Sequence, residues 1–406
     1  MIIKDLIKKN LPKVYGFARK NFKRITIKKT SNIENLRKQN IRYFESIKSE
    51  KYFDYKKKIF KEDHNKSRSF AYLEINNSCN INCVMCDTKS STRQKKMMNL
   101  SLVESSLKKI KKMGINRVSL HTIGDPLANA KLDEVFKLLR KYNMYTSIST
   151  NGLLLTKNLS TLKNYIDVCS DIKFSIDGCT KETYEKIRFG GNWEELLVNF
   201  RTAKEVLEPL GYRISVLNIL MKENFHEIGK FITFFGKFFN NPYERVEFDI
   251  LNSLSPSNIF FENNNLFENH TYLNKFCTLV SNPIPFILVD GKLSVCCRDY
   301  DGSLVMGDTN NESIENILNS ENFKDLQKSH SDENSNSFSQ YNLCNTCYHI
   351  DDRITFIFIN LTKMIIYKFV NKDDSFYQNK IEKIVRFLNE IHKYENYSQF
   401  EREIFN

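Results

Sequence analysis

Glycine and proline are scarce in this sequence, which has 13 glycines and 7 prolines among 406 residues. So low a content excludes a collagen-like fibre and argues against a broadly disordered, low-complexity chain. The sequence also lacks any run of about 18 to 20 uncharged apolar residues, so it predicts no membrane-spanning helix. Its first residues have neither the continuous apolar core nor the small-residue cleavage site of a signal peptide.

Ten cysteines are present without a secretion signal. Disulfides are rare in reducing compartments, so this usage favours metal ligation over disulfide bonding. We therefore expect a cytoplasmic protein. The alternative is a protein that binds the inner face of the membrane from the cytoplasm.

The net charge of +13 is unevenly placed, because residues 1–66 carry 20 basic and 7 acidic residues and the remainder is balanced. Apolar residues in this basic arm recur at steps of three and four, which predicts a helical stripe: Ile3, Leu6, Ile7, Leu11, Val14, Ala18, Phe22 and Ile25. A basic amphipathic helix suits contact with an anionic membrane surface or packing on its own domain. We expect residues 1–67 to form a helical arm.

From residue 68 to residue 255 strand-like and helix-like patterns alternate. The expected strands are Ala71–Ile75, Arg117–His121, Tyr145–Ser149, Ile172–Ile176, Arg213–Ile219 and Arg245–Ile250. Such alternation predicts an α/β fold with a parallel sheet and right-handed crossovers. Beyond it we expect a polar linker over 256–269, a cysteine-bearing domain over 270–350 and a C-terminal helical segment over 351–406. The apolar stretch Ile354–Leu361 in that last segment predicts a buried strand or helix.

Three cysteines, Cys79, Cys83 and Cys86, follow the first expected strand. Three thiolates in so short a run can bind three irons of a 4Fe–4S cluster and leave the fourth iron open for chemistry. The competing interpretations are a zinc site and a disulfide pair. A zinc site needs a fourth nearby Cys or His, and the next histidine in the sequence is His121.

The spacing C-x3-C-x2-C resembles the radical S-adenosylmethionine (radical SAM) superfamily. The resemblance implies a partial (β/α)6 TIM-like barrel with the cysteine loop at its carboxyl end. It also implies that SAM binds the open iron and is cleaved to a 5′-deoxyadenosyl radical, which removes a hydrogen atom from the substrate. An electron donor such as flavodoxin or ferredoxin follows from this chemistry, and we expect no nucleic-acid partner.

Further segments resemble the SAM contacts of that family. Gly124-Asp125-Pro126 stands where the family has G-G-E-P, with Ile123 in place of the first glycine and Asp125 in place of the glutamate. Ser149-Thr150-Asn151-Gly152 resembles the family's T-N-G, although each segment alone is also an ordinary turn. The resemblance implies these SAM-binding residues: Met85, Gly124, Asp125, Pro126, Ser149, Asn151, Ser175, Asp177 and Asn218.

A second group of cysteines forms C-x13-G-x4-C, through Cys277, Gly291 and Cys296, followed by the C-x2-C pair Cys344 and Cys347. This pattern resembles the SPASM/twitch extension of radical SAM enzymes. No cysteine follows Cys347 in the sequence, so the resemblance implies one auxiliary 4Fe–4S cluster with these four cysteines as ligands. Cys297 is an alternative to Cys296, and a four-cysteine zinc site is an alternative to the cluster.

We interpret the chain as a radical SAM oxidoreductase that oxidises a carbinol carbon of a sugar or another saccharide-type small molecule, with the auxiliary cluster accepting the electron. The single-cluster extension resembles enzymes that dehydrogenate small alcohols. Asp299 and Tyr300 follow the auxiliary cysteine and are candidates for the catalytic base, and Arg298 for binding an anionic group. The alternatives are a peptide-modifying maturase and a metal-stabilised binding protein without enzymatic activity.

Overall fold

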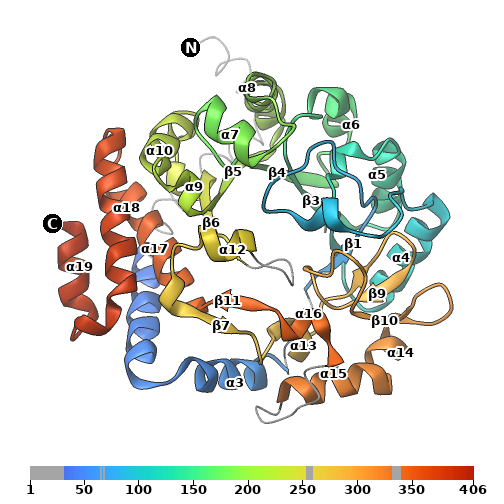
Figure 1. Ribbon diagram of the computed structural model, residues 1–406. Helices are drawn as coiled ribbons and strands as arrows, with labels where there is room; N and C mark the ends of the chain where they lie inside the picture. Colours follow the sequence, from blue (N-terminus) through green and yellow to red (C-terminus); the bar gives the residue numbers. More distant parts are fainter. Residues whose placement is uncertain (1–31, 65, 67–68, 122, 253–258, 332–339) are drawn as a thin grey trace, which may run out of the picture.

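The computed structural model describes residues 32–64, 66, 69–121, 123–252, 259–331 and 340–406. Seen in the orientation of Figure 1, strands and helices are arranged as a ring, with the strands β1 to β6 on its inner side and most helices outside them. This arrangement directs one face of the sheet towards the middle of the molecule.

Six parallel strands form the main part of the sheet, in the spatial order β1 to β6. They are β1 (Ala71–Leu73), β2 (Arg117–Ser119), β3 (Tyr145–Thr150), β4 (Cys169–Ser175), β5 (Arg213–Leu220) and β6 (Val246–Ile250). The predicted α/β class and all six predicted strands are confirmed, with ends shifted by a few residues. The sheet ends at β6 without closing, as a partial barrel does.

Helices alternate with these strands and cover the outer face of the sheet. The longer ones are α4 (Leu100–Lys112), α5 (Leu132–Lys141), α7 (Lys181–Ile187), α8 (Trp193–Thr202) and α10 (Ile228–Gly236); the shorter ones are α6 (Leu159–Asn164), α9 (Lys222–Phe225) and α11 (Pro242–Arg245). Phenylalanines fill the space between sheet and helices: the rings of Phe174 on β4 and Phe235 on α10 both lie edge-on to Phe200 on α8. Each of these three side chains is fully buried, which contributes about 1.5–3 kcal/mol apiece.

The second cysteine region shares the same sheet rather than standing apart from it. Strand β8 (Phe286–Ile287) pairs in parallel with β1, and β9 (Lys292–Ser294) and β10 (Val305–Asp308) follow in antiparallel order. A separate ribbon joins β7 (Thr271–Leu273) to β11 (Tyr348–Ile350). The two cysteine regions are therefore linked directly through the backbone hydrogen bonds between β1 and β8.

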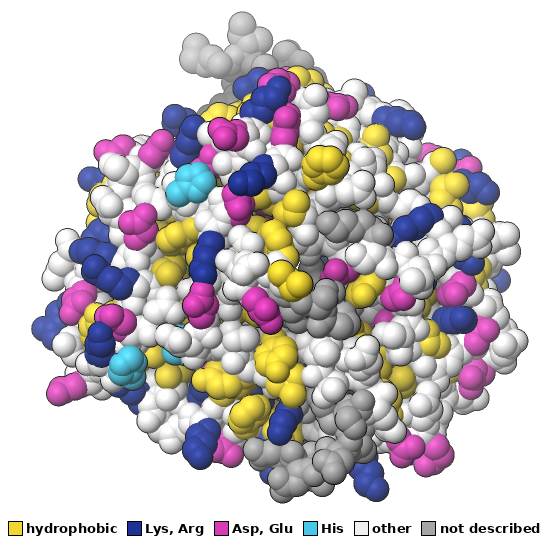
Figure 2. All heavy atoms as spheres, in the orientation of Figure 1, with side chains coloured by type: hydrophobic (Ala, Val, Ile, Leu, Met, Phe, Trp, Pro, Cys, Tyr) yellow, Lys and Arg dark blue, Asp and Glu magenta, His cyan; other side chains and the backbone are white. Residues whose placement is uncertain are grey.

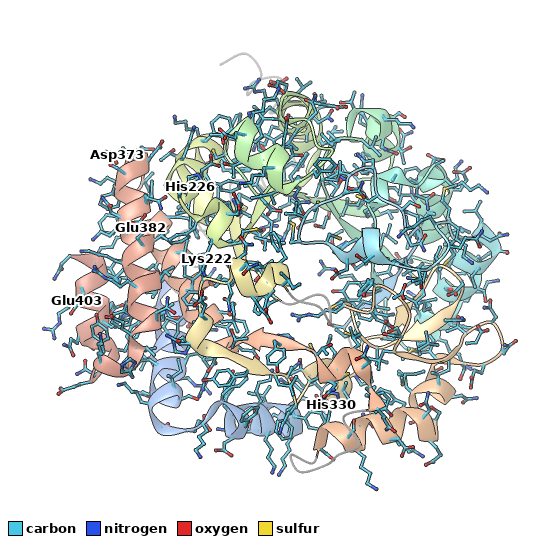
Figure 3. All side chains as sticks on the ribbon, viewed as in Figure 1. Lys222, His226, His330, Asp373, Glu382 and Glu403 are labelled. Carbon is cyan, nitrogen blue, oxygen red and sulfur yellow. The ribbon has the colours of Figure 1, made fainter. Side chains whose placement is uncertain are left out.

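Short helices complete this region: α12 (Ile259–Asn264), α13 (Thr278–Ser281), α14 (Ile314–Leu318), α15 (Glu321–Ser331) and α16 (Asn342–Asn345). The expected linker over 256–269 is wrong where it is described, because α12 forms there and buries Phe261. On α15, His330 (labelled in Figure 3) is buried and its Nδ1 lies 2.8 Å from the carbonyl oxygen of Lys275, which fixes the segment leading to Cys277.

The two ends of the described chain pack together. Residues 32–49 and α3 (Tyr52–Asp63) are helical, whereas the amphipathic stripe of residues 3 to 25 lies outside the described residues. At the C-terminus, α17 (Asp352–Lys368), α18 (Asp374–Asn389) and α19 (Tyr397–Phe405) follow, so the apolar stretch from Ile354 is a buried helix. Arg353 pairs with Asp351 at 2.8 Å and donates to the carbonyl oxygens of Ser46 and Glu50, joining both ends.

None of the helices in the described ranges is both long enough and apolar enough to cross a membrane.

Candidate functional site

A pocket of about 210 Å³ opens at the carboxyl ends of β1 to β5, where the loops of parallel strands meet. Its lining includes Cys79, Cys83 and Cys86 from the loop after β1. Backbone N–H groups of Asn82 and Val84 donate to the carbonyl oxygens of Phe189 and Ile187, so the end of α7 holds this loop in place. The three sequence-predicted ligands of the first cluster are thus gathered at one site.

Each sulfur of this trio has a polar partner. Asn151 Nδ2 donates to Cys79 Sγ at 3.6 Å, Arg188 Nη1 donates to Cys83 Sγ at 3.6 Å, and Thr88 Oγ1 lies 3.0 Å from Cys86 Sγ. Burial raises the pKa of the Cys83 thiol to about 11 and also raises that of Cys79. Isolated thiolates are therefore unfavourable here, whereas thiolates bound to iron and stabilised by these donors would be favourable.

Gly124 allows the loop after β2 to approach the cysteine loop. It has a φ of 85°, and a Cβ atom there would lie 2.6 Å from the carbonyl oxygen of Ser78. The next residue, Asp125, donates its backbone N–H to the same carbonyl oxygen at 3.0 Å. Only glycine combines this conformation with this contact, so the position supports the root of the cysteine loop.

Most of the residues predicted to bind SAM line this pocket, namely Met85, Gly124, Asp125, Ser149, Asn151 and Ser175. Ser149 and Ser175 lie side by side, with their hydroxyl oxygens 3.2 Å apart. The carboxylate of Asp125 accepts hydrogen bonds from Thr150 Oγ1 and from the backbone N–H groups of Asn151 and Leu127. Asp125 therefore holds the ends of two strands together at the wall of the pocket.

Three predicted SAM-binding residues do not line the pocket. Pro126 begins the 3₁₀ turn Pro126–Ala128 and is buried. Asn218 is buried on β5 and accepts a hydrogen bond from Asn224. Asp177 is fully buried and forms an ion pair with Arg188 at 2.6 Å. Their placement supports a role in positioning neighbouring residues rather than in touching SAM.

Arg188, which sequence reasoning missed, connects this buried carboxylate to the cysteine loop. Its guanidinium reaches Asp177 with Nη2 and the sulfur of Cys83 with Nη1. Both charged groups are almost completely buried. No spacing rule relates an arginine after α7 to a cysteine after β1, because the contact arises only when α7 packs beside the loop.

His121 was also absent from the predicted site, yet it lines the same pocket. Its Nδ1 lies 3.1 Å from the hydroxyl of Ser119. Burial, with Lys173 nearby, lowers the pKa of His121 to about 4, so the imidazole is neutral at neutral pH. A neutral imidazole can accept or donate a hydrogen bond to a bound molecule.

The second set of cysteines gathers where the β7–β11 ribbon meets the turn after β9. The ribbon brings Cys277 and Cys347 together, since each cysteine lies just beyond one of its two strands. Burial and then the neighbouring thiols, Cys277 among them, raise the pKa values of Cys296 and Cys344. The four predicted auxiliary ligands, Cys277, Cys296, Cys344 and Cys347, are therefore close enough to influence one another.

Nitrogen donors surround these sulfurs as well. The backbone N–H of Arg298 donates to Cys296 Sγ at 3.4 Å, and its Nη1 donates to Cys347 Sγ at 3.8 Å. His349 Nε2 lies 3.3 Å from Cys347 Sγ. Such donors stabilise negative charge on sulfur and help to set the reduction potential of a cluster.

Cys297 lies beside this group and differs from Cys296 in exposure. Cys296 is partly buried, whereas Cys297 is solvent-accessible. Desolvation raises the pKa of Cys297. The pKa of Tyr72 is raised to about 12, mainly by burial of its ring and then by the nearby Cys297 thiol. We keep Cys296 as the proposed ligand, with Cys297 facing Tyr72.

The donor set fits two iron–sulfur clusters better than single ions. Within the described ranges, no group of three or more His, Cys, Asp or Glu side chains is placed to hold one metal ion. The thiolates of a 4Fe–4S cluster do not have to meet at one metal ion, because each thiolate binds a different iron. Three cysteines at the pocket and four in the second set match an open and a closed cluster respectively.

Asp299 does not suit the predicted role of catalytic base. It is buried, and its carboxylate accepts hydrogen bonds from Ser294 Oγ, from the backbone N–H of Leu304 and from both the backbone N–H and the hydroxyl of Ser303. These bonds shape the turn that carries Cys296. Tyr300 follows in that turn, where its carbonyl oxygen accepts from Ser91 Oγ at 3.1 Å, and its proposed role stays a prediction.

Polar side chains lie on the inner face of the sheet, a surface that we call the chamber. Side chains alternate between the two faces of a strand, and Ser149 and Ser175 on the inner face line the pocket. The same face carries Lys173, Glu247 and Asp249, since Lys173 pairs in register with Ser149 and binds Glu247 at 2.7 Å. Figure 2 shows Lys and Arg side chains among Asp and Glu side chains over this face of the molecule, so neither sign of charge dominates it.

Aromatic residues connect the chamber to both cysteine sets. Tyr72 on β1 stacks on Phe286 of β8, with ring centroids 4.0 Å apart, and meets the ring of His121 edge-on at 6.3 Å. His121 lines the first pocket, and Cys297 influences Tyr72 from the other side. The chamber is thus bordered by the first cysteine trio at one end and by the second set at the other.

Family models match both regions. The model of the radical SAM superfamily matches residues 73–235, and that of the SPASM family, an iron–sulfur cluster-binding domain, matches residues 277–348. The chain therefore carries a radical SAM domain followed by a SPASM domain. This enzyme accordingly uses SAM and a 4Fe–4S cluster, with an auxiliary cluster in its SPASM domain.

Curated relatives of this radical SAM enzyme include GTP 3′,8-cyclases. The cyclase of Petrotoga mobilis is 28% identical over 174 residues, covering 41% of this chain and 52% of the relative. The probable GTP 3′,8-cyclase of Pyrococcus abyssi is 22% identical over 188 residues, covering 46% and 59%. The chain spans about half the length of the curated relatives it matches.

Among solved structures, Streptococcus suis SuiB bound to precursor peptide SuiA is 12% identical, with a TM-score of 0.51, and the match covers 71% of this chain and 73% of SuiB. BtrN in complex with AdoMet and 2-DOIA is 19% identical, with a TM-score of 0.46, covering 70% and 93%. At 12% identity the similarity to SuiB shows a shared fold and nothing more. The TM-score for BtrN is too low to support a conclusion.

Proposed function

We propose that this radical SAM enzyme is an oxidoreductase that converts a carbinol carbon of a small, sugar-like substrate to a carbonyl. The observation that carries the proposal is the inner face of the sheet, which bears hydroxyl and charged side chains along neighbouring strands. Ser149, Ser175, Lys173 and Glu247 lie on this face. A polyhydroxylated molecule can form hydrogen bonds with these side chains in addition to the bonds they form with one another, whereas an apolar molecule would only remove them from water.

Register places further polar residues on the same face. Ser119 and Ser147 are partners on β2 and β3, and Ser215 on β5 is the partner of Lys173. Ser147 lies two residues before Ser149 and therefore points the same way. Ser119 and Ser215 are buried, whereas Ser147 and Ser149 on β3 and Ser175 on β4 are partly exposed, so these three hydroxyl groups support recognition of a substrate by its own hydroxyl groups.

The proposed reaction removes a hydrogen atom, a proton and an electron from R₂CHOH and leaves R₂C=O. Bound SAM and its cluster would supply the acceptor for the hydrogen atom, and the auxiliary cluster would accept the electron. Cys79, Cys83 and Cys86 would hold the first cluster, and Cys277, Cys296, Cys344 and Cys347 the second. A flavodoxin or ferredoxin is the proposed source of the electron that starts the reaction.

The N-terminal segment supports a small substrate over a peptide. In its described part, residues 32–63, the backbone is helical and carries no strand. Peptide-modifying maturases often carry a recognition domain of mixed strands and helices. The peptide alternative therefore remains an outcome of the test rather than the proposal.

Anaerobic incubation of the reconstituted full chain with SAM and dithionite tests the proposal. The probes are ring-deuterated myo-inositol, glucosamine and UDP-glucose, and a synthetic peptide library deuterated at Cα and Cβ. We expect deuterium in 5′-deoxyadenosine and a carbonyl product from at least one saccharide. A Cys83→Ala variant serves as the control and should form no 5′-deoxyadenosine. Deuterium transfer from peptides alone would replace the proposal with the maturase.

A further inference from the structure

Asp249 is a carboxylate of the chamber that neither the sequence patterns nor the cysteine sets point to. It lies on β6 between Phe248 and Ile250, both buried towards the helices, whereas Asp249 itself is solvent-accessible. Alternation along the strand therefore directs it to the inner face of the sheet. Its register partner on β5 is Ile219, which lines the pocket of the cysteine trio.

The groups that face Asp249 come from three sides of the chamber. Desolvation by the protein around this side chain raises the pKa of Asp249, although Arg298 beside the auxiliary cysteines and Lys173 on β4 favour its ionised form. Arg298 also donates to the sulfur of Cys347. Lys173 binds Glu247, two residues before Asp249 on the same strand, and lies near the neutral His121. Asp249 is therefore a neighbour of both cysteine sets without contacting a cysteine in either.

The hydrogen bonds of Asp249 leave one of its carboxylate oxygens available to accept a proton. Its Oδ1 accepts from the backbone N–H of Ile250 at 2.8 Å, and Oδ2 has no hydrogen-bond partner among the residues that the structure describes. It also forms no ion pair within those residues. Asp299, by contrast, uses both oxygens within its own turn.

We propose that Asp249 is the catalytic base that takes the hydroxyl proton of the substrate. This inference rests on the proposed function. In the balanced reaction, the O–H bond of R₂CHOH breaks and its proton passes to the carboxylate of Asp249, as the C–O single bond becomes a double bond. The hydrogen atom on carbon and the remaining electron leave to the two acceptors named above, so that R₂C=O and a protonated Asp249 result.

An Asp249→Asn variant tests the assignment, because it keeps the shape of the side chain and removes the basic oxygen. We expect deuterium transfer from the ring-deuterated saccharide to 5′-deoxyadenosine to persist, and formation of the carbonyl product to slow by about 100-fold or more. The two readouts separate proton removal from hydrogen-atom removal. Substrate affinity, measured by calorimetry on the same samples, should change by less than about threefold, which corresponds to about 0.6 kcal/mol.

Asp171→Asn is the matched control. Asp171 lies on the same face, two residues before Lys173 on β4, and pairs with Arg213 at 3.2 Å towards the amino ends of the strands. This variant should form product at close to the rate of the unmodified enzyme. An Asp249→Glu variant should recover part of the rate, since it restores a carboxylate.

Different failures have different meanings. Product formation by Asp249→Asn at the unmodified rate would overturn the assignment and leave the proposed function standing. Equal loss of deuterium transfer, product and substrate binding would show that Asp249 positions the substrate instead, which also overturns it. Absence of deuterium transfer from every saccharide in the unmodified enzyme would overturn the proposed function and this inference together.

Discussion

Arg188 shows how one side chain can serve both the fold and the cluster site. Its guanidinium neutralises the buried carboxylate of Asp177 and donates to the sulfur of Cys83. A buried ion pair of this kind adds little to stability by itself, but removing one partner leaves an uncompensated charge. The arginine is therefore needed for the fold around the cysteine loop as well as for the sulfur.

An Arg188→Gln variant should lose about 3–5 kcal/mol of unfolding free energy, because the Asp177 carboxylate stays buried without its partner. In protein that still binds iron, the midpoint potential of the first cluster should become more negative, since a positive donor to its ligand sulfur is gone. Urea unfolding and a redox titration followed by EPR measure the two effects.

Lys186→Gln provides the control for Arg188→Gln. It removes one positive charge two residues before Arg188, on α7, but Lys186 is exposed and pairs with Glu223 at the surface. Little change in either measurement is expected for Lys186→Gln. A double variant, Asp177→Asn with Arg188→Gln, should recover part of the lost stability. An unaltered potential in Arg188→Gln would contradict the role of Arg188 at the sulfur.

At the scale of elements, the contact between α10 and α18 attaches the C-terminal helices to the barrel. Gly229 on α10 lets the two helices approach closely: a Cβ atom there would clash with the carbonyl oxygen of Asp374 at the start of α18. The backbone N–H of Gly229 also donates to Gln378 Oε1 at 3.1 Å. A backbone atom cannot move aside as a flexible side chain can, so the helix itself must shift.

A Gly229→Ala variant should therefore be less stable by about 1–3 kcal/mol, even though alanine favours the helix. Gly236→Ala on the same helix is the control, because its Cβ would meet only Pro242 at an ordinary 3.5 Å. That variant should be neutral or slightly stabilised. Thermal unfolding of both variants, with hydrogen exchange of α18, checks the prediction, and equal stability of the two would refute the close contact.

At the scale of the whole molecule, strand β8 joins the two cysteine regions, so that both can contribute to one site. Its pairing with β1 places the turn after β9, with Cys296 and Cys297, beside the inner face of the barrel. Figure 1 shows the resulting ring, in which the β7–β11 ribbon lies across from β4 and β5. A substrate between them would lie close to both cysteine sets.

Iron content tests the two-cluster arrangement. The reconstituted chain should bind about eight irons, and a variant with Cys344→Ala and Cys347→Ala about four, because four thiolates are needed to close the auxiliary cluster. A variant with Cys169→Ala and Cys179→Ala also loses two buried cysteines but should keep all the iron. Iron and sulfide assays with EPR give the count; an equal iron content in both variants would disprove the second cluster.

The sequence alone determined the class of fold, and it predicted two sets of metal ligands. Alternating apolar patterns predicted all six parallel strands, because burial of one face imposes the period that each element shows. Cysteine spacing predicted the ligand sets, since Cys79, Cys83 and Cys86 are neighbours in the chain and need only a short loop to meet. The motifs at Gly124, Ser149 and Ser175 could be predicted for a similar reason, because each lies at the carboxyl end of a strand.

Only the tertiary structure decided which polar residues meet across the chain. Arg188, His121 and Asp249 carry no local pattern. Residues from other parts of the chain face them: Asp177 for Arg188, Tyr72 for His121 and Lys173 for Asp249. Asp299 was predicted as a base from its place three residues after Cys296, yet hydrogen bonds occupy both oxygens of its carboxylate. Sequence proximity places a residue on an element, whereas the register and packing of those elements determine whether its side chain faces the chamber or supports its wall.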